Sequence, residues 1–188
     1  MSRRVAFLSL RIVLCLSVVV GIPASGSAQA SRGTPLAPSL AKARLAEAVA
    51  AAKKWRADAI LIQISGYGIG SDGLRVLWDY GYWSAAAKTC LIVNIAPGNP
   101  PQTRESGGEM CEEAELKPPF IDSDQAMKAA RTGGVSAPTA TMVLSNAPSK
   151  QGPRALWIVM DGRGTAPGNA MVDIDAVTGM VLGKRVQR

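Results

Sequence analysis

The stretch Val172-Asp-Ile-Asp-Ala-Val-Thr-Gly-Met-Val-Leu182 decides how we interpret the fold. Val172 and Ile174 alternate with aspartates, as in a strand that buries one face. Asp175 can accept hydrogen bonds from the backbone just downstream of it, and Gly179 can adopt the positive φ that a tight turn requires. The stretch therefore predicts two antiparallel strands joined by a short turn.

Upstream of this hairpin, the sequence predicts one helix and two further strands. Asp122 and Gln125 have the spacing of a capping box at the start of a helix, and Gly133-Gly134 can end that helix. Short apolar runs follow at 139–145 and 154–160. Strands joined by such short turns favour an antiparallel sheet, with the helix covering one face.

The first half of the chain repeats this order of elements. Apolar residues recur at three- and four-residue spacing from Leu45 to Trp55, which predicts a helix with one apolar face. Three strands are predicted after it, at 59–65, 74–83 and 89–96, with a glycine-rich turn before the second. We therefore expect an α+β protein of two tandem units, each with one helix packed on a three- to four-stranded antiparallel sheet.

The N-terminus has the three parts of a secretory signal peptide. Three arginines precede the apolar residues 12–20, which are too few to span a bilayer. Ala28 and Ala30 place small side chains where a signal peptidase cleaves. We expect cleavage after Ala30, a periplasmic or extracellular location, and no stable membrane anchor after cleavage.

Two cysteines, Cys90 and Cys111, remain after this cleavage, because Cys15 lies in the signal peptide. In an oxidising compartment two cysteines favour one disulfide, and two free thiols are the alternative.

The expected organisation along the chain has five parts. They are a signal peptide at 1–30, a flexible leader at 31–38, a first helix-plus-sheet unit at 39–97, a disulfide-tethered loop at 98–119 and a second unit at 120–188.

Three stretches of the second half resemble a PepSY-type domain. They are the helix at 123–131, the strand at 156–159 and the hairpin at 172–182. The first half is similar to the family as a diverged copy that lacks the closing hairpin, which suggests a tandem repeat. Members of the family occur in exported proteins and in propeptides of secreted proteases. The resemblance implies a non-catalytic module that binds or restrains a protein partner, with a protease as one candidate, and it transfers no catalytic residues.

The chain contains no histidine, which excludes Ser-His-Asp and Cys-His catalysis and every histidine-ligated metal site. The run Gly68-Ile-Gly-Ser-Asp-Gly73 matches a dinucleotide-binding fingerprint, but a strand pattern follows it where a helix is required, so we interpret it as a hairpin turn. Asp173 and Asp175 share one side of a strand and could form an acid/base pair, although Asp175 already has a role in the turn. We expect neither an enzyme nor a cofactor or metal site.

Nucleic acid is not an expected partner. Loss of the three arginines of the signal peptide lowers the net charge from +7 to +4, and no run of lysine and arginine follows.

The candidate partner surface consists of Leu77, Trp83 and Trp157. By strand alternation, each of these residues faces away from the helix of its own unit. Two interpretations stay open, since the two units could bury these faces against each other or a partner could cover them. A small-ligand carrier, with a pocket between helix and sheet, is the alternative to a binding or inhibitory module.

Overall fold

The computed structural model describes residues 36–107, 111, 114–148, 152–163 and 166–187. The predicted signal peptide and most of the predicted leader lie outside the described residues.

Two helices, each followed by four strands, make up the described part of the chain. In chain order the elements are α1 (Leu45–Trp55), β1 (Ile60–Ile69), β2 (Trp78–Ser84), β3 (Thr89–Ile95), β4 (Gln102–Gly107), α2 (Ser123–Gly133), β5 (Ala140–Ala147), β6 (Arg154–Asp161), β7 (Ala170–Asp175) and β8 (Val181–Val186).

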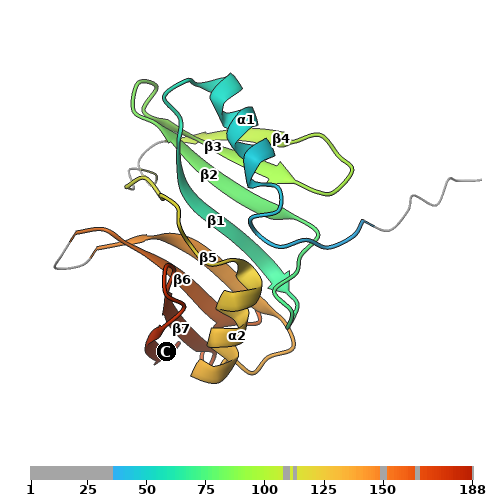
Figure 1. Ribbon diagram of the computed structural model, residues 1–188, viewed down its shortest axis with the longest axis vertical. Helices are drawn as coiled ribbons and strands as arrows, with labels where there is room; N and C mark the ends of the chain where they lie inside the picture. Colours follow the sequence, from blue (N-terminus) through green and yellow to red (C-terminus); the bar gives the residue numbers. More distant parts are fainter. Residues whose placement is uncertain (1–35, 108–110, 112–113, 149–151, 164–165, 188) are drawn as a thin grey trace, which may run out of the picture. The chain divides into compact units, whose positions relative to one another are not determined.

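All eight strands belong to one antiparallel sheet in the order β4-β3-β2-β1-β5-β6-β7-β8 (Figure 1). At its centre β1 pairs with β5, so that Ile64 lies opposite Leu144 and Ser65 lies opposite Val143. The prediction of two tandem units, each a helix on its own sheet, is therefore wrong. Alternation of apolar residues identifies strands, but it does not show which strand edges pair with each other.

Both helices pack on the same face of this sheet. In Figure 1, α1 lies in front of β2 and β3, and α2 lies in front of β6 and β7. One fully buried row of side chains crosses the sheet beneath them, namely Val93, Tyr80, Ile64, Leu144, Trp157 and Ile174. The side chains under α1 and those under α2 therefore form one continuous hydrophobic core.

The largest differences from the predicted elements lie in the first half of the chain. β1 continues to Ile69, through half of the predicted glycine-rich turn, and β2 begins at Trp78 instead of residue 74. The predicted loop at 98–119 contains the strand β4. Nearly all of β4 is exposed and its residues are polar or glycine, so it lacks the alternation by which strands are recognised in a sequence.

The predicted disulfide between Cys90 and Cys111 is confirmed, with the two Cα atoms 6.2 Å apart. The chain also returns to β3 as predicted, since Cys90 lies opposite Ser106 of β4. On the face of the sheet away from the helices, Cys90, Ile62 and Trp83 form a small buried cluster, and Cys111 packs against it.

The start of α2 connects the two halves of the chain. Asp122 caps the helix as predicted, and Gln125 completes the capping box. The same Asp122 carboxylate accepts a hydrogen bond from the backbone N–H of Lys42 at 3.0 Å. Ser123 adds a second link, because its hydroxyl accepts from the N–H of Ala41 at 3.1 Å. The cap of α2 thus also holds the segment that precedes α1.

We predict that Asp122→Ala lowers the free energy of unfolding by about 1–2 kcal/mol, because it removes the cap and leaves the Lys42 N–H without its acceptor. Urea denaturation followed by circular dichroism measures the change. Gln125→Ala is the control, since it removes only the weaker return bond to the Asp122 N–H, at 3.3 Å. Equal losses in the two variants would contradict a role for Asp122 beyond the helix itself.

Candidate functional site

The face of the sheet opposite the helices, here called the helix-free face, is formed by the side chains that alternate with the core. Two neighbouring rows cross it from β4 to β7. One row is Gln102, Asn94, Asp79, Ser65, Val143, Ile158 and Asp173, and the other is Arg104, Ile92, Gly81, Gln63, Ser145, Leu156 and Asp175.

Apolar side chains occupy the part of this face on β5 and β6. Val143, Leu156, Ile158 and Met160 are half-buried there, and they lie outside the core. Neither of the two described helices packs on them, because both helices lie on the other face. This part of the sheet therefore presents apolar surface that the fold itself does not need to bury.

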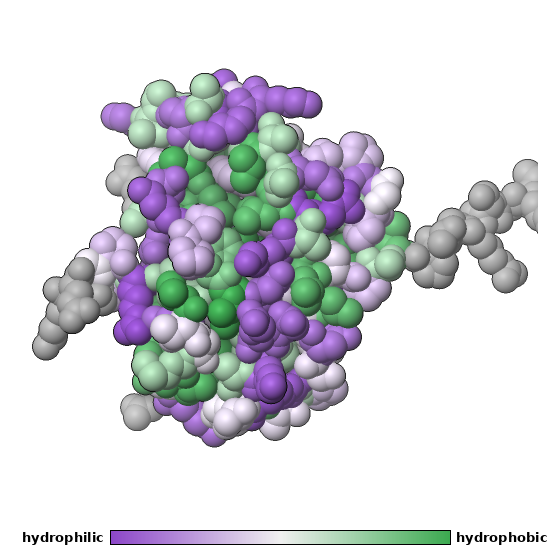
Figure 2. All heavy atoms as spheres, viewed as in Figure 1, coloured by the Kyte–Doolittle hydropathy of each residue, from purple (hydrophilic) through white to green (hydrophobic). Residues whose placement is uncertain are grey.

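The helix-covered side of the molecule differs in how its polar and apolar residues are distributed. Figure 2 shows it in space-filling form, with hydrophilic residues interspersed among hydrophobic ones. Val49 is an apolar residue of α1 that is exposed on the surface. Single exposed apolar side chains of this kind are ordinary on a protein surface.

Charged and polar groups border the apolar part of the helix-free face. Arg154 pairs with Asp175 at 2.6 Å, and Arg185 pairs with Asp173 at 2.6 Å. Towards β3, Asp79 accepts a hydrogen bond from the amide of Asn94. Burial raises the pKa of Asp79, while this hydrogen bond acts in the opposite direction.

The geometry of Asp175 identifies it as a turn residue. Burial is the largest influence and opposes ionisation of its carboxyl group, but hydrogen bonds from Thr178, Arg154 and Val177 together outweigh it and lower the pKa to about 2. A general acid or base works best with a pKa near the operating pH. Asp173 is paired with Arg185 at 2.6 Å, so each of the two aspartates is engaged by its own arginine.

Leu77, Trp83 and Trp157 do not come together as a surface. Leu77, which precedes β2, is 38% exposed, whereas Trp83 at the other end of that strand is 9% exposed in the cluster beside the disulfide. Trp157 is 0% exposed, and its indole N–H donates to the carbonyl of Ile121 at 3.1 Å. The expectation that Trp157 faces away from the helix is therefore wrong.

The error at Trp157 has a physical cause. β6 is apolar on both sides, so alternation separates its residues into two sets without showing which set faces the helix. The structure buries Trp157 and Val159 in the core and leaves Leu156, Ile158 and Met160 half-buried on the helix-free face. In the sequence, the apolar residues on both sides of β6 were the feature that indicated apolar surface outside the core.

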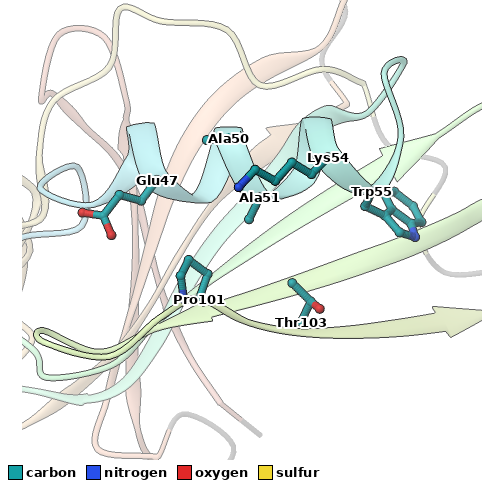
Figure 3. Close-up of a pocket in the computed structure, with 7 residues that line it drawn as sticks. All are labelled: Glu47, Ala50, Ala51, Lys54, Trp55, Pro101 and Thr103. Carbon is teal, nitrogen blue, oxygen red and sulfur yellow. The ribbon is translucent and has the colours of Figure 1, made fainter.

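A groove of about 520 Å³ lies between α1 and the edge of the sheet (Figure 3). Figure 3 shows that Ala51 points from the helix toward Pro101 and Thr103, and that Trp55 lies at one end of the groove. Glu47, Ala50 and Lys54 complete the lining. The Trp55 indole N–H donates to Glu105 of β4 at 2.7 Å, which fixes the ring at the end of the groove.

A second groove, of about 640 Å³, is lined by Tyr67, Gly68, Arg75, Thr139 and Arg163. A third, of about 400 Å³, lies where residues 114–117 pass Asn146 and Ala155. Within the described ranges, no three histidine, cysteine or acidic residues gather closely enough to hold a metal ion. Neither described helix is long and apolar enough to cross a membrane.

No family model and no curated protein matches the sequence. The fold is similar to the crystal structure of a protein from Clostridium difficile 630 that is described as a candidate lipoprotein. The two chains are 12% identical with a TM-score of 0.51, over 75% of this chain and 91% of the other. At this identity the similarity shows the fold alone, and the resemblance to PepSY-type domains stays a prediction.

We predict that Asp175→Asn flattens the acid limb of the stability profile. An aspartate in the unfolded chain has a pKa of about 3.9. The lower pKa of folded Asp175 means that its ionised form stabilises the fold above about pH 4, and that this contribution is lost as the pH falls toward about 2. Thermal midpoints measured across this range should fall less steeply in the variant than in the wild type.

Glu115→Gln is the matched control for this pH series, because Glu115 forms an exposed ion pair with Lys117 and such pairs contribute little. If the thermal midpoint of Asp175→Asn depended on pH as it does in the wild type, the hydrogen bonds to the Asp175 carboxylate would not lower its pKa as described.

Proposed function

We propose that this protein is an exported, non-catalytic module that binds a protein partner and restrains it through the helix-free face of its sheet. The observation that carries this proposal is the apolar surface of β5 and β6, which lies outside the core with neither helix over it. Contiguous apolar surface rimmed by polar groups is typical of protein interaction sites.

The composition of the helix-free face supports a protein as its occupant. Val143, Leu156 and Ile158 form an apolar centre, and the ion pairs of Asp173 and Asp175 lie beside it on β7. Protein interfaces have the same arrangement of an apolar core within a polar rim. A hydrogen-bonded sheet also holds these side chains in place before binding, so little conformational entropy is lost on association.

Export is supported by two features of the chain. The N-terminal residues have the pattern of a cleavable signal peptide. The disulfide between Cys90 and Cys111 is the kind of bond that persists in oxidising compartments. We place the mature protein in the periplasm or outside the cell, and the structurally similar protein is itself described as a candidate lipoprotein.

A secreted protease is the partner class that we favour. The resemblance of 123–131, 156–159 and 172–182 to PepSY-type domains supports it, because that family occurs in the propeptides of secreted proteases. The proposed action is steric, since a module without catalytic groups restrains a partner by occupying its surface.

A small-ligand carrier is the second candidate function. The groove between α1 and the sheet edge favours it, since Ala50, Ala51 and Trp55 offer apolar contacts and Glu47 and Lys54 offer polar ones. Small-molecule sites combine these two kinds of lining in a cavity of about 300–1,000 Å³.

We predict that a photo-cross-linking amino acid at position 158 captures a partner protein in the cell envelope to which the chain is exported. The same probe at position 49, on the outer surface of α1, is the matched control. It should capture none of the proteins that are captured at position 158. Mass spectrometry identifies the captured protein, and a purified partner then allows inhibition to be measured. Capture of the same proteins at both positions would overturn the helix-free face as the binding surface.

The carrier function predicts that Ala51→Phe fills the groove and abolishes binding of an apolar fluorescent probe such as 1-anilinonaphthalene-8-sulfonate. Val49→Phe adds the same ring to the outer surface of α1 and should leave binding unchanged. Probe fluorescence measures the binding. A probe that binds both variants equally is not held in the groove, and the carrier function would then lose its support.

A further inference from the structure

Two arginines line the 640 Å³ groove at the end of β1. They are Arg75, which lies between β1 and β2, and Arg163, which follows β6. None of the ion pairs formed by the described residues includes either guanidinium group. The hydroxyl-bearing side chains of Tyr67 and Thr139 complete the polar lining.

The position of Arg75 is fixed by its backbone and by its own side chain. Its N–H and carbonyl both bond to Ser39, at 3.0 and 2.7 Å. Its Nε donates to the carbonyl of Leu77 at 3.1 Å, which leaves the two terminal nitrogens for another acceptor.

Gly68 provides the space that this guanidinium group occupies. A Cβ atom at Gly68 would lie 3.1 Å from a terminal nitrogen of Arg75, and the residue has a φ of +64° that favours glycine. The guanidinium group therefore lies close against the backbone of β1 because position 68 has no side chain.

Arg163 is placed by a turn that is bound to the start of β5. The N–H of the preceding Gly162 donates to the carbonyl of Thr139 at 2.9 Å, and its carbonyl accepts from the hydroxyl of Thr141 at 2.9 Å. These bonds hold the backbone next to Arg163, while the side chain itself is exposed.

Among the described residues, no acid forms an ion pair with either arginine of the groove. The charge of Arg75 acts on Asp79, but no ion pair joins the two, and burial raises the pKa of Asp79. The carboxylate of Asp161 is engaged with backbone N–H groups of Ser136, Ala137 and Ala170.

We propose that this groove is a binding site for an organic carboxylate, held by Arg75 and Arg163 with Tyr67 and Thr139 as hydroxyl partners. The planar guanidinium group matches a carboxylate through two parallel hydrogen bonds. The volume of the groove exceeds what a bare inorganic anion requires and falls in the range of small-molecule sites, about 300–1,000 Å³. The ring of Tyr67, which is 54% exposed, offers an apolar wall to the carbon body of the ligand.

The carboxylate can belong to a small free acid or to an acidic side chain of a peptide. Three titrations of the ¹⁵N-labelled protein separate these sources, with sodium succinate, with acetyl-Gly-Glu-Gly-amide and with inorganic phosphate, all at constant ionic strength. The backbone amide signals of Gly68 and Gly162 report binding, because both residues adjoin the arginines. We expect saturable shifts of these signals with succinate or the peptide, and the tighter of the two identifies the source.

Arg163→Gln should weaken this binding by about tenfold or more, since it removes charge-assisted hydrogen bonds to the ligand. Arg75→Gln should have a similar effect. Arg104→Gln, which removes an exposed arginine of β4, is the control and should change the affinity less than about twofold, as expected for a screened charge outside the site. Any one of three results would overturn the proposal. They are the absence of a saturable shift with both organic anions, tighter binding of phosphate than of either organic anion, and unchanged binding in Arg163→Gln.

Discussion

The backbone pairing of β1 with β5 is the interaction on which the rest of the structure depends. It places Ile64 beside Leu144 within the core and Ser65 beside Val143 on the opposite face. Two separate four-stranded sheets would have four open edges, whereas the joined sheet has two, at β4 and β8. The same pairing merges the apolar layers under α1 and α2, so neither half buries its side chains alone.

Local features of the sequence were predicted well, and long-range pairing was not. Three local features were predicted correctly, namely the capping box of Asp122 and Gln125, the Asp175 turn and the cysteine pair. Each of them depends on only a few residues, and those residue types commonly play the same structural role in other proteins. The joining of the sheet rests on hydrogen bonds between backbone groups, which every residue possesses. Side chains therefore carried no signal that β1 and β5 would be neighbours.

The candidate surface was predicted in kind but not in position. The apolar character of β6 on both sides indicated surface outside the core, yet the large Trp157 fills the core and the smaller Leu156 and Ile158 remain outside. Trp83 was assigned to the correct face, but the disulfide brings Cys111 against the cluster that contains it. Strand alternation describes the two faces of a sheet, but it does not show that a disulfide brings Cys111 onto one of them.

The two edge strands of the sheet differ in the polarity of the side chains that they expose. β4 is polar, whereas β8 carries the exposed apolar side chains of Val181, Leu182 and Val186. An open strand edge of this kind can template the addition of another chain. Lys184 lies on the same strand, whereas the charge of Arg185 is paired with Asp173, so two copies that approach edge to edge bring their Lys184 ammonium groups together. Repulsion between these lysines opposes edge-to-edge pairing, and because concentrated salt screens that repulsion, we expect salt to favour association through β8.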